Sequence, residues 1–406
     1  MLYNIAIGLY DLLVHLVAPF SRKPRKMMKG HWVVYELLRQ QVEPGSEYIW
    51  FHAASLGEFE QGRPLIEKIR AKYPQYKILL TFFSPSGYEV RKHYRGADIV
   101  CYLPFDKIRN VKKFLNIVNP RMAFFIKYEF WKNYLDELHK RRIPVYSVSS
   151  IFRRDQIFFK WYGGTYRNVL KNFDHLFVQN EASKRYLSKI GISRATMVGD
   201  TRFDRVLQIR EDAKELPLVE KFKNGTFTLV AGSSWGPDED LFLEYFNNHP
   251  EMKLIIAPHV IDENHLVEII AKLRRPYVRY TKADDQNVCK ADCLIIDCFG
   301  LLSSIYRYGD VAYIGGGFGV GIHNTLEAAV YGIPVLFGPK YQKFLEAIQL
   351  LESQGAFSVK DFEDLQLLLD RFYHEKDFLH EIGTNAGNYV LGNSGATDRI
   401  MNMINF

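Results

Sequence analysis

The sequence predicts an α/β protein made of two doubly wound parallel sheets, and three observations lead to this class. Short apolar runs alternate with segments of helical periodicity, the alternation pauses once and restarts, and the net charge changes sign at the pause. The composition, with 47% hydrophobic and 24% charged residues, suits a globular enzyme-sized protein. It excludes disordered, collagen-like and disulfide-scaffold proteins.

Five apolar runs are expected to form the strands of the first half: residues 48–53, 77–83, 122–128, 144–150 and 175–180. Five more are expected in the second half: residues 227–234, 253–259, 293–298, 311–317 and 334–339. Between the two sets lies a charged stretch that contains Pro217, so we expect a linker near residues 206–222.

The charge is divided unevenly between the halves. Up to residue 208 there are 35 Lys and Arg against 18 Asp and Glu, or +17, whereas the rest has 18 against 28, or −10. A strongly basic half predicts an anionic partner for that half.

Residues 1–21 contain no Lys or Arg and carry an apolar helix face, with Asn4, Asp11 and His15 on the other side. A basic flank follows, comprising Arg22, Lys23, Arg25, Lys26 and Lys29. This pattern predicts an anchor on the cytoplasmic side of an anionic membrane. A helix docked on its own domain is the alternative; a spanning helix is marginal and a secretory signal fits poorly.

A glycine-rich turn is expected after the run 311–317, where Gly316 and Gly317 would let the backbone approach a ligand. A helix beginning near Asn324 would offer free N–H groups to a phosphate, and Glu327 could accept hydrogen bonds from ribose hydroxyls. A tight turn without any ligand is the alternative. The pattern matches neither a Walker A loop nor a dinucleotide fingerprint.

Other polar residues also follow predicted strands. Glu58 could be a general base or a helix cap, and Glu129 and Arg202 could serve a site or form surface ion pairs. Ser233, Ser234 and His259 are positioned to meet a nucleotide. The acidic runs Asp238-Glu239-Asp240 and Asp284-Asp285 are expected to be solvated surface charge, and no metal ligand set is expected.

Seven segments together resemble the 3-deoxy-D-manno-octulosonic acid (Kdo) transferase family of lipopolysaccharide assembly. They occur in order over nearly the whole chain: HAASLGEFEQGRPLI, TFFSPSGYE, YLPFD, IKYEFWKNYL, VQNEASKRYLSKIG, VGDTRFD and GGGFGVGIHNTLEAAVYGIPVLFGP.

The resemblance implies a GT-B glycosyltransferase with two Rossmann-like domains that face a central cleft. Residues 1–21 would be the anchor, 22–208 the domain for the lipid A precursor, 209–377 the CMP-Kdo domain, and 378–406 a helix that crosses back. The implied place is the cytoplasmic face of the inner membrane, with no metal and no nucleic acid.

The resemblance also implies site residues. Glu58 matches the catalytic base, and Glu129 and Arg202 match positions that stabilise the transition state. CMP contacts are implied for Pro258, His259, Phe299, Gly300, Leu301, Asn324, Thr325, Leu326 and Glu327. The chain departs from the family pattern at three of these positions: Arg202 replaces Lys, His259 replaces Arg, and Leu301 replaces Glu.

Three other functions remain open: another GT-B nucleotide-sugar transferase, a UDP-sugar epimerase, and a non-catalytic membrane-surface binding protein. A soluble epimerase has no use for the apolar helix and the basic half, which argues against that alternative.

Overall fold

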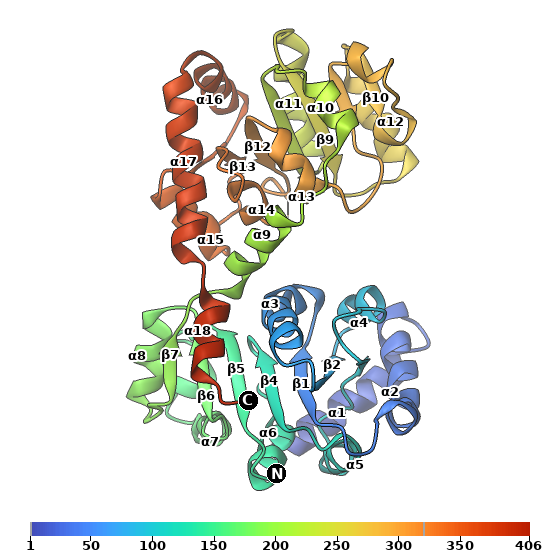
Figure 1. Ribbon diagram of the computed structural model, residues 1–406, viewed down its shortest axis with the longest axis vertical. Coiled ribbons are helices and arrows are strands. Elements are labelled where there is room, and N and C mark those ends of the chain that lie inside the picture. The colour runs from blue at the N-terminus through green and yellow to red at the C-terminus, as the bar shows by residue number, and fades with distance from the viewer. Residues whose placement is uncertain (1, 320) are drawn as a thin grey trace. The chain divides into compact units, whose positions relative to one another are not determined.

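A computed structural model describes residues 2–319 and 321–406 (Figure 1). The chain forms two compact units: residues up to Arg205 together with Ser394–Phe406, and Val206–Asn393. The expected boundaries were 208/209 and 377/378. The helix α9 (Thr201–Glu211) runs through the start of the expected linker, and α10 (Pro217–Lys223) lies at its end.

The N-terminal unit contains a parallel seven-stranded sheet in the order β3-β2-β1-β4-β5-β6-β7. Its strands are β1 (Tyr48–Ala53), β2 (Lys77–Phe82), β3 (Ile99–Tyr102), β4 (Met122–Ile126), β5 (Val145–Ser150), β6 (His175–Val178) and β7 (Ala195–Met197). The helices that follow them are α3 (Leu56–Lys72), α4 (Pro85–Arg91), α5 (Ile108–Val118), α6 (Lys132–Lys140), α7 (Gly164–Leu170) and α8 (Glu181–Lys189). Apolar clusters cover both faces of the sheet.

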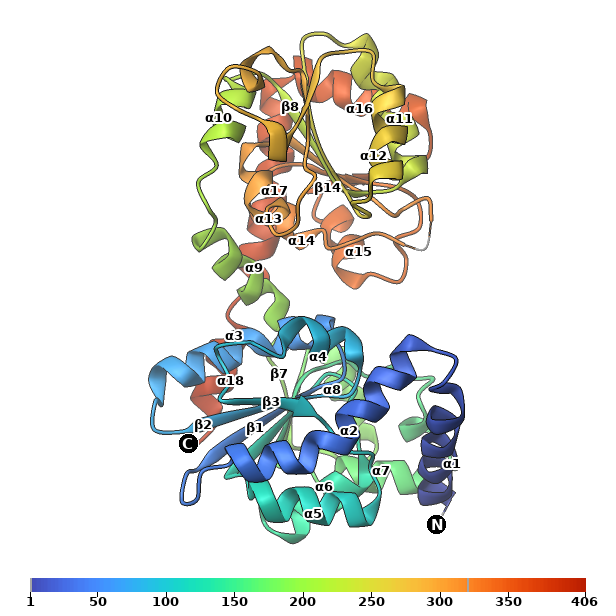
Figure 2. The same cartoon turned by 90° about the vertical axis from the view of Figure 1, so that its right-hand side faces the viewer.

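The C-terminal unit repeats this arrangement with the order β10-β11-β9-β8-β12-β13-β14. Its strands are β8 (Thr228–Ser234), β9 (Lys253–Pro258), β10 (Tyr277–Arg279), β11 (Cys293–Ile295), β12 (Val311–Ile314), β13 (Val335–Phe337) and β14 (Ala356–Ser358). Its other helices are α11 (Gly236–Asn248), α12 (Glu263–Lys272), α13 (Leu302–Ile305), α14 (Leu326–Ala329), α15 (Leu345–Glu352), α16 (Phe362–His374) and α17 (Lys376–Asn393) (Figure 2). The predicted fold class of two doubly wound parallel sheets is confirmed.

The C-terminal segment ends in two helices where one was expected. After α17 the chain turns at Gly395, whose φ is 88°, and α18 (Ala396–Met403) belongs to the N-terminal unit. The Asp204 carboxylate stabilises the start of α18, because it accepts hydrogen bonds from the N–H groups of Gly395 and Thr397 at 2.5 and 2.6 Å. Ile400 and Met401 complete an apolar cluster there.

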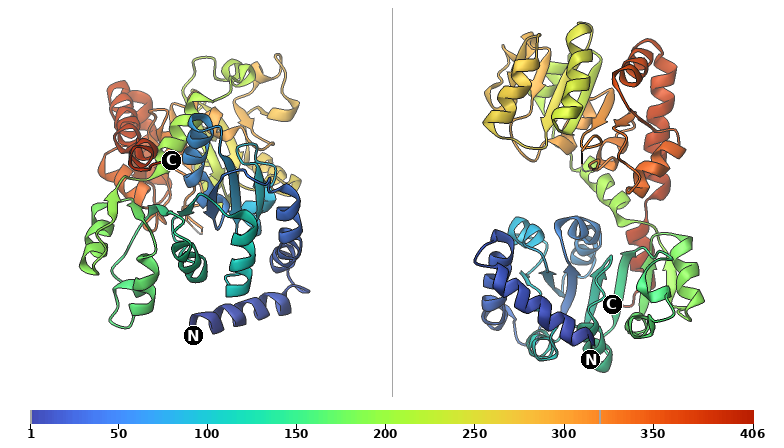
Figure 3. Two further views of the ribbon diagram at one scale, coloured as in Figure 1. Left: turned by 60° about the horizontal axis from the view of Figure 1, so that its bottom comes forward. Right: turned by 180° about the vertical axis from the view of Figure 1, so that it is seen from behind.

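The first two helices are α1 (Leu2–Val17) and α2 (Arg22–Gln41), which form a bend of 114°. Taken alone, no helix among the described residues has the length and apolarity to cross a membrane, although this bent pair passes that test by length and composition. α1 lies along the outside of the N-terminal unit (Figure 3).

α1 contacts its unit through polar groups and through the buried Val14, which clusters with Phe105. Tyr3 donates a hydrogen bond to the Asp106 carboxylate, Asn4 accepts one from Asn133 at 2.8 Å, and Asp11 pairs with Lys107. Most of its apolar side chains are exposed: Leu2, Ile5, Leu9, Leu12, Leu13, Leu16, Val17 and Phe20. The helix is therefore docked on its own unit and still presents an apolar face.

Candidate functional site

Both sheets reverse their winding at one pair of adjacent strands. These adjacent strands are β1 and β4 in the N-terminal unit and β8 and β12 in the C-terminal unit. In the N-terminal sheet, for example, β2 and β3 lie beyond β1, whereas β5, β6 and β7 lie on the other side, beyond β4. Loops at the carboxyl ends of such strands diverge and leave room for a ligand. The predicted residues Glu58 and Glu129 follow β1 and β4, and Ser234 and Gly316 lie at the ends of β8 and β12.

Glu58 occupies the first turn of α3, and its carboxylate accepts a hydrogen bond from the N–H of Ala54 at 2.5 Å. Ala54 precedes Ser55, the N-cap residue of α3, so this contact ties the loop after β1 to the first turn of the helix. Burial, and next the negative charge of Glu129, raise the pKa of Glu58 to about 7. A carboxylate with this pKa can accept a proton near neutral pH.

Glu129 follows β4 and is almost buried, with 9% of its surface exposed. One carboxylate oxygen lies 3.0 Å from Nε2 of His52 and 2.6 Å from Nε1 of Trp131. On the other side of the imidazole, Nδ1 lies 2.9 Å from the hydroxyl of Thr81, which accepts from the Trp50 indole at 2.8 Å. With the Thr81 hydroxyl donating to Nδ1, the ring proton of His52 is on Nε2 and is donated to the Glu129 carboxylate. The His52, Thr81, Trp50 and Trp131 donors then all have acceptors.

Arg202 lies in the first turn of α9. Its Nε and a terminal nitrogen both lie 2.8 Å from one oxygen of Asp200, which is buried. The other oxygen of Asp200 accepts from the Gln61 amide at 3.1 Å, so the pair is tied to α3 one turn beyond Glu58. Part of the Arg202 charge is therefore already balanced within the protein.

These three predicted residues lie at the same edge of one sheet. Glu58 and Glu129 interact electrostatically, and Asp200 links Arg202 to α3. Lys127, in the loop after β4, also acts on Glu58 and favours its charged form. The edge combines a carboxylate that titrates near pH 7, a buried carboxylate and a paired guanidinium.

In the C-terminal unit, the turn after β12 is closely packed against its neighbours. Gly316 has a φ of 94°, and its N–H donates to the Asp238 carboxylate at 2.8 Å. A Cβ on Gly317 would lie 2.5 Å from backbone atoms of Gly338. Glycine is required here by the close approach of two backbone segments.

Three aromatic rings stack beside this turn. His259, which is exposed, lies 4.7 Å from Trp235 and 4.3 Å from His323 between ring centroids, with interplanar angles of 28° and 24°. Burial, and next His259, lower the pKa of His323. The stack offers a flat aromatic surface and ring nitrogens at the carboxyl end of β9.

The remaining predicted residues of the C-terminal unit lie at the carboxyl ends of its strands or in the segments that follow them. The Ser234 hydroxyl donates to the buried Glu239 at 2.9 Å, and Asn324 pairs with Glu327 at 2.9 Å. The others are Ser233 at the end of β8 with a φ of 54°, Pro258 at the end of β9, the exposed Phe299 and Gly300, half-buried Leu301, and buried Thr325 and Leu326.

The helix expected near Asn324 spans Leu326–Ala329, so it begins within two residues of the expected position and is one turn long. One sequence expectation in this region was wrong. Asp238 and Glu239 are each only 1% exposed, because they accept hydrogen bonds from the Gly316 N–H and the Ser234 hydroxyl. Only Asp240 of that run is solvated, whereas Asp284 and Asp285 are exposed as predicted.

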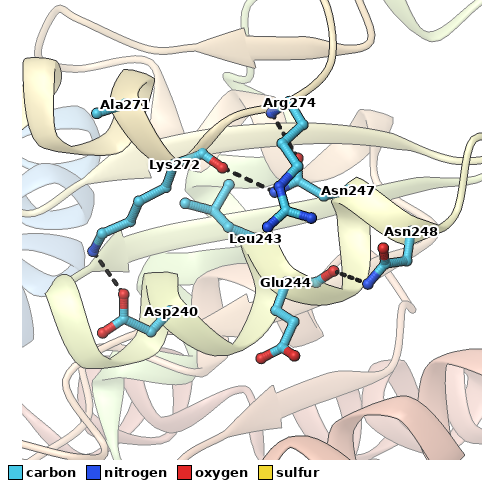
Figure 4. A pocket seen from close by; sticks show the side chains of 8 residues that line it. All are labelled: Asp240, Leu243, Glu244, Asn247, Asn248, Ala271, Lys272 and Arg274. Atoms are coloured by element: carbon cyan, nitrogen blue, oxygen red, sulfur yellow. Dashed lines mark hydrogen bonds and ion pairs between the residues drawn. The ribbon is translucent and has the colours of Figure 1, made fainter.

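A surface cavity of about 390 Å³ lies between α11 and α12 (Figure 4). Lys272 and Asp240 form an ion pair of 2.6 Å there, and the amides of Asn247 and Asn248 donate to backbone carbonyls of the lining. It contains no predicted site residue and is away from the strand ends. Within residues 2–319 and 321–406, no group of three His, Cys, Asp or Glu side chains could hold a metal ion.

Sequence reasoning missed His52 and Trp131 in the N-terminal unit, and Trp235, His323 and Asp238 in the C-terminal unit. Each of these residues is within three positions of a strand or helix end, which is a weak signal by itself. Their contacts join residues that are far apart in the chain, as with His52 and Glu129, so only the folded sheet reveals them.

Residues 29–205 match the family model described as 3-Deoxy-D-manno-octulosonic-acid transferase (kdotransferase). A 3-deoxy-D-manno-octulosonic acid transferase from Aquifex aeolicus is 27% identical over 78% of this chain and 83% of its own length. The Haemophilus influenzae protein of the same name is 23% identical over 89% and 87%.

A bifunctional glycosyltransferase/methyltransferase from Fusobacterium nucleatum is 26% identical over 94% of this chain, which spans only 60% of that protein. Among solved structures, the UDP-GlcNAc 2-epimerase from Neisseria meningitidis aligns with a TM-score of 0.61 at 13% identity, over 87% of this chain and 98% of the epimerase. Acinetobacter baumannii MurG aligns at 0.55 and 10% identity, over 88% and 99%. These structures share the fold.

Proposed function

We propose that this chain, which is similar to Kdo transferases over most of its length, is a glycosyltransferase that transfers Kdo from CMP-Kdo to the lipid A precursor. The observation that carries this proposal is the electrostatic interaction of the Glu58 and Glu129 carboxylates where β1 and β4 lie side by side in the N-terminal sheet. Burial and the Glu129 charge tune Glu58 for proton transfer from a hydroxyl near neutral pH.

In the proposed reaction a glucosamine 6-hydroxyl of the acceptor attacks the ketosidic carbon of Kdo. Glu58 takes the hydroxyl proton, the new C–O bond forms with inversion, and the bond to CMP breaks so that CMP leaves with its electron pair. The Glu129 carboxylate favours positive charge developing on the sugar, and Arg202 favours the anionic groups of the donor.

The donor is assigned to the C-terminal unit, where the glycine-rich turn and the ring stack adjoin the carboxyl ends of β8, β9 and β12. The close backbone turn at Gly316 and Gly317 suits a phosphate, and the stack of Trp235, His259 and His323 suits a base or an anion. His259 stands where the family pattern has Arg, so an imidazole ring takes the place of a guanidinium.

The test uses the purified full chain with CMP-Kdo and lipid A precursor, with mass spectrometry of the lipid product and release of CMP as readouts. A product heavier by whole Kdo residues supports the proposal. Thermal-shift comparison of CMP, CDP, UMP and UDP identifies the nucleotide independently. Stabilisation by uridine nucleotides alone, or epimerisation of a UDP-sugar, would assign one of the other functions.

We also propose that the protein acts on the cytoplasmic face of the inner membrane, because the proposed acceptor is a lipid. The exposed apolar face of α1 and the basic start of α2 support this assignment. We expect the double substitution Leu9→Glu and Leu16→Glu to weaken binding to phosphatidylglycerol vesicles at least tenfold, because both exposed side chains would leave the bilayer interface. Vesicle co-sedimentation measures this, and unchanged binding would assign α1 a purely structural role.

His52 is expected to position Glu129, because the imidazole is fully buried and contacts the carboxylate at 3.0 Å. His52→Leu removes that donor from a buried acceptor, which costs about 1–3 kcal/mol. We expect kcat to fall at least tenfold with little change in KM. His52→Gln can still place an amide N–H near the same oxygen and is expected to restore most of kcat. Equal loss in both variants, at equal thermal stability, would contradict this role.

A further inference from the structure

A second amphipathic surface lies in the N-terminal unit, formed by the segment after β5. Trp161 is 90% exposed and Tyr162 is 60% exposed, and their rings contact each other with centroids 5.4 Å apart. We name residues 157–163 the aromatic loop. Two large neighbouring aromatic side chains in water are unusual at a surface without a partner.

The local structure holds these side chains outward. Phe158 anchors the base of the loop in the core, with its ring 5.2 Å from that of Phe130. The Lys160 carbonyl accepts hydrogen bonds from the Gly163 N–H at 3.0 Å and from the Arg167 guanidinium at 2.8 Å. A Cβ at Gly163 would meet the Ile157 carbonyl oxygen at 1.9 Å, so the turn is tight. The exposure of Trp161 is therefore built into the fold.

A cavity of about 490 Å³ adjoins the base of the loop. Phe159, Tyr186 and Ile190 supply apolar walls, with the first two rings 5.6 Å apart, and Arg154 and Lys189 supply positive charge. We name it the basic cavity. Residues 151–194 contain nine Lys and Arg against three Asp and Glu. An apolar wall under two cations matches a phosphate headgroup that carries acyl chains.

The aromatic loop belongs to the same region of the unit as α1. α7, which directly follows the loop, and the N-terminal end of α1 lie at the same end of the unit in two perpendicular views (Figures 1 and 2). Tyr166 on α7 also interacts electrostatically with Tyr3 on α1; burial, the Asp106 carboxylate and, more weakly, Tyr166 raise the pKa of Tyr3.

We propose that the aromatic loop and the basic cavity form a second membrane contact, in which Trp161 and Tyr162 enter the interface and Arg154 and Lys189 bind an anionic phospholipid headgroup. Trp and Tyr favour the headgroup level because their rings are amphipathic. Two separated contacts would orient the unit on the bilayer as well as hold it there. This inference rests on the proposed membrane function and extends it to a surface that the sequence did not indicate.

The test measures binding of the full chain to phosphatidylglycerol vesicles and to phosphatidylcholine vesicles. Trp161→Ser with Tyr162→Ser is expected to weaken binding to both at least fivefold. Arg154→Gln with Lys189→Gln is expected to weaken binding only to the anionic vesicles, by about tenfold. Leu367→Ser is the matched control, since this side chain is 68% exposed on α16 of the other unit and is expected to have no effect.

A second readout locates the loop directly. In a Trp32→Phe background, vesicles with brominated acyl chains are expected to quench Trp161 fluorescence, and Trp161→Phe removes that quenched component. Unchanged vesicle affinity in the loop variants, or no quenching of Trp161, would overturn the proposal even if the α1 variant loses binding. Displacement of the protein from vesicles by millimolar inorganic phosphate alone would assign the basic cavity to a free anion instead.

Discussion

Glu58→Gln is expected to lower the rate of Kdo transfer by a hundredfold or more, the scale typical of losing a general base. Gln keeps the shape of the side chain and can still accept the Ala54 N–H, so the start of α3 is preserved. It cannot take a proton from the acceptor hydroxyl. Initial rates with saturating CMP-Kdo and acceptor measure the loss, and CMP binding by thermal shift is expected to remain near that of the natural chain. Turnover close to that of the natural chain would remove Glu58 from the base role.

The pH dependence gives an independent check of the same residue. Because the pKa of Glu58 is about 7, the base is protonated at lower pH, and kcat/KM is expected to fall about tenfold per unit well below that value. The stability effect has a definite sign, since burial raises this pKa from 4.5. The folded chain favours the protonated Glu58 carboxyl. Its contribution to the free energy of unfolding is complete below pH 4.5 and is lost as the carboxyl ionises, when pH rises through about 7. Glu58→Gln is therefore expected to melt at a higher temperature than the natural chain at pH 8.

Gly317→Ala is expected to weaken donor binding and to destabilise the C-terminal unit. The added Cβ would lie 2.5 Å from the Cα and N of Gly338, and backbone atoms cannot move aside as a flexible side chain can. Overpacking of this kind costs about 1–3 kcal/mol, and any relief must open the turn after β12. We expect CMP affinity to fall at least tenfold in isothermal titration, together with a lower melting temperature.

The same turn provides a matched control. A Cβ at Gly319 would have its nearest neighbour at 3.7 Å, which is ordinary contact, and this residue is exposed. Gly319→Ala is therefore expected to bind CMP within about twofold of the natural chain, as for a surface change within ±0.5 kcal/mol. Equal loss in the two variants would show that general flexibility of the turn, and not the close approach to Gly338, determines binding.

The sequence predicted the central strands well and the edges poorly. All ten predicted apolar runs contain strands, whereas β3, β7, β10 and β14 were not expected. These four strands have three or four residues and lie at the outer edges of the two sheets. An edge strand is covered less completely than a central one, so it needs no long apolar run.

Charged residues were harder to place than strands. The acidic run at Asp238 and Glu239 carries the composition of a solvated helix start, but its partners, Gly316 and Ser234, come from two strand ends. In α1, Asn4 and Asp11 were expected on the helix side opposite the apolar face. Together with Tyr3 they dock the helix on its unit.

By itself, the sequence determined which segments are buried strands and that carboxylates and glycines follow them, because periodicity and turn chemistry are local properties. It also carries, in order, the seven segments that resemble the Kdo transferase family. Only the tertiary structure decided that β1 lies beside β4, which brings Glu58 near Glu129 and places His52 against that carboxylate. Strand order depends on how helices pack across a sheet, and the pKa of Glu58 depends on the burial and the neighbouring charge that this packing creates.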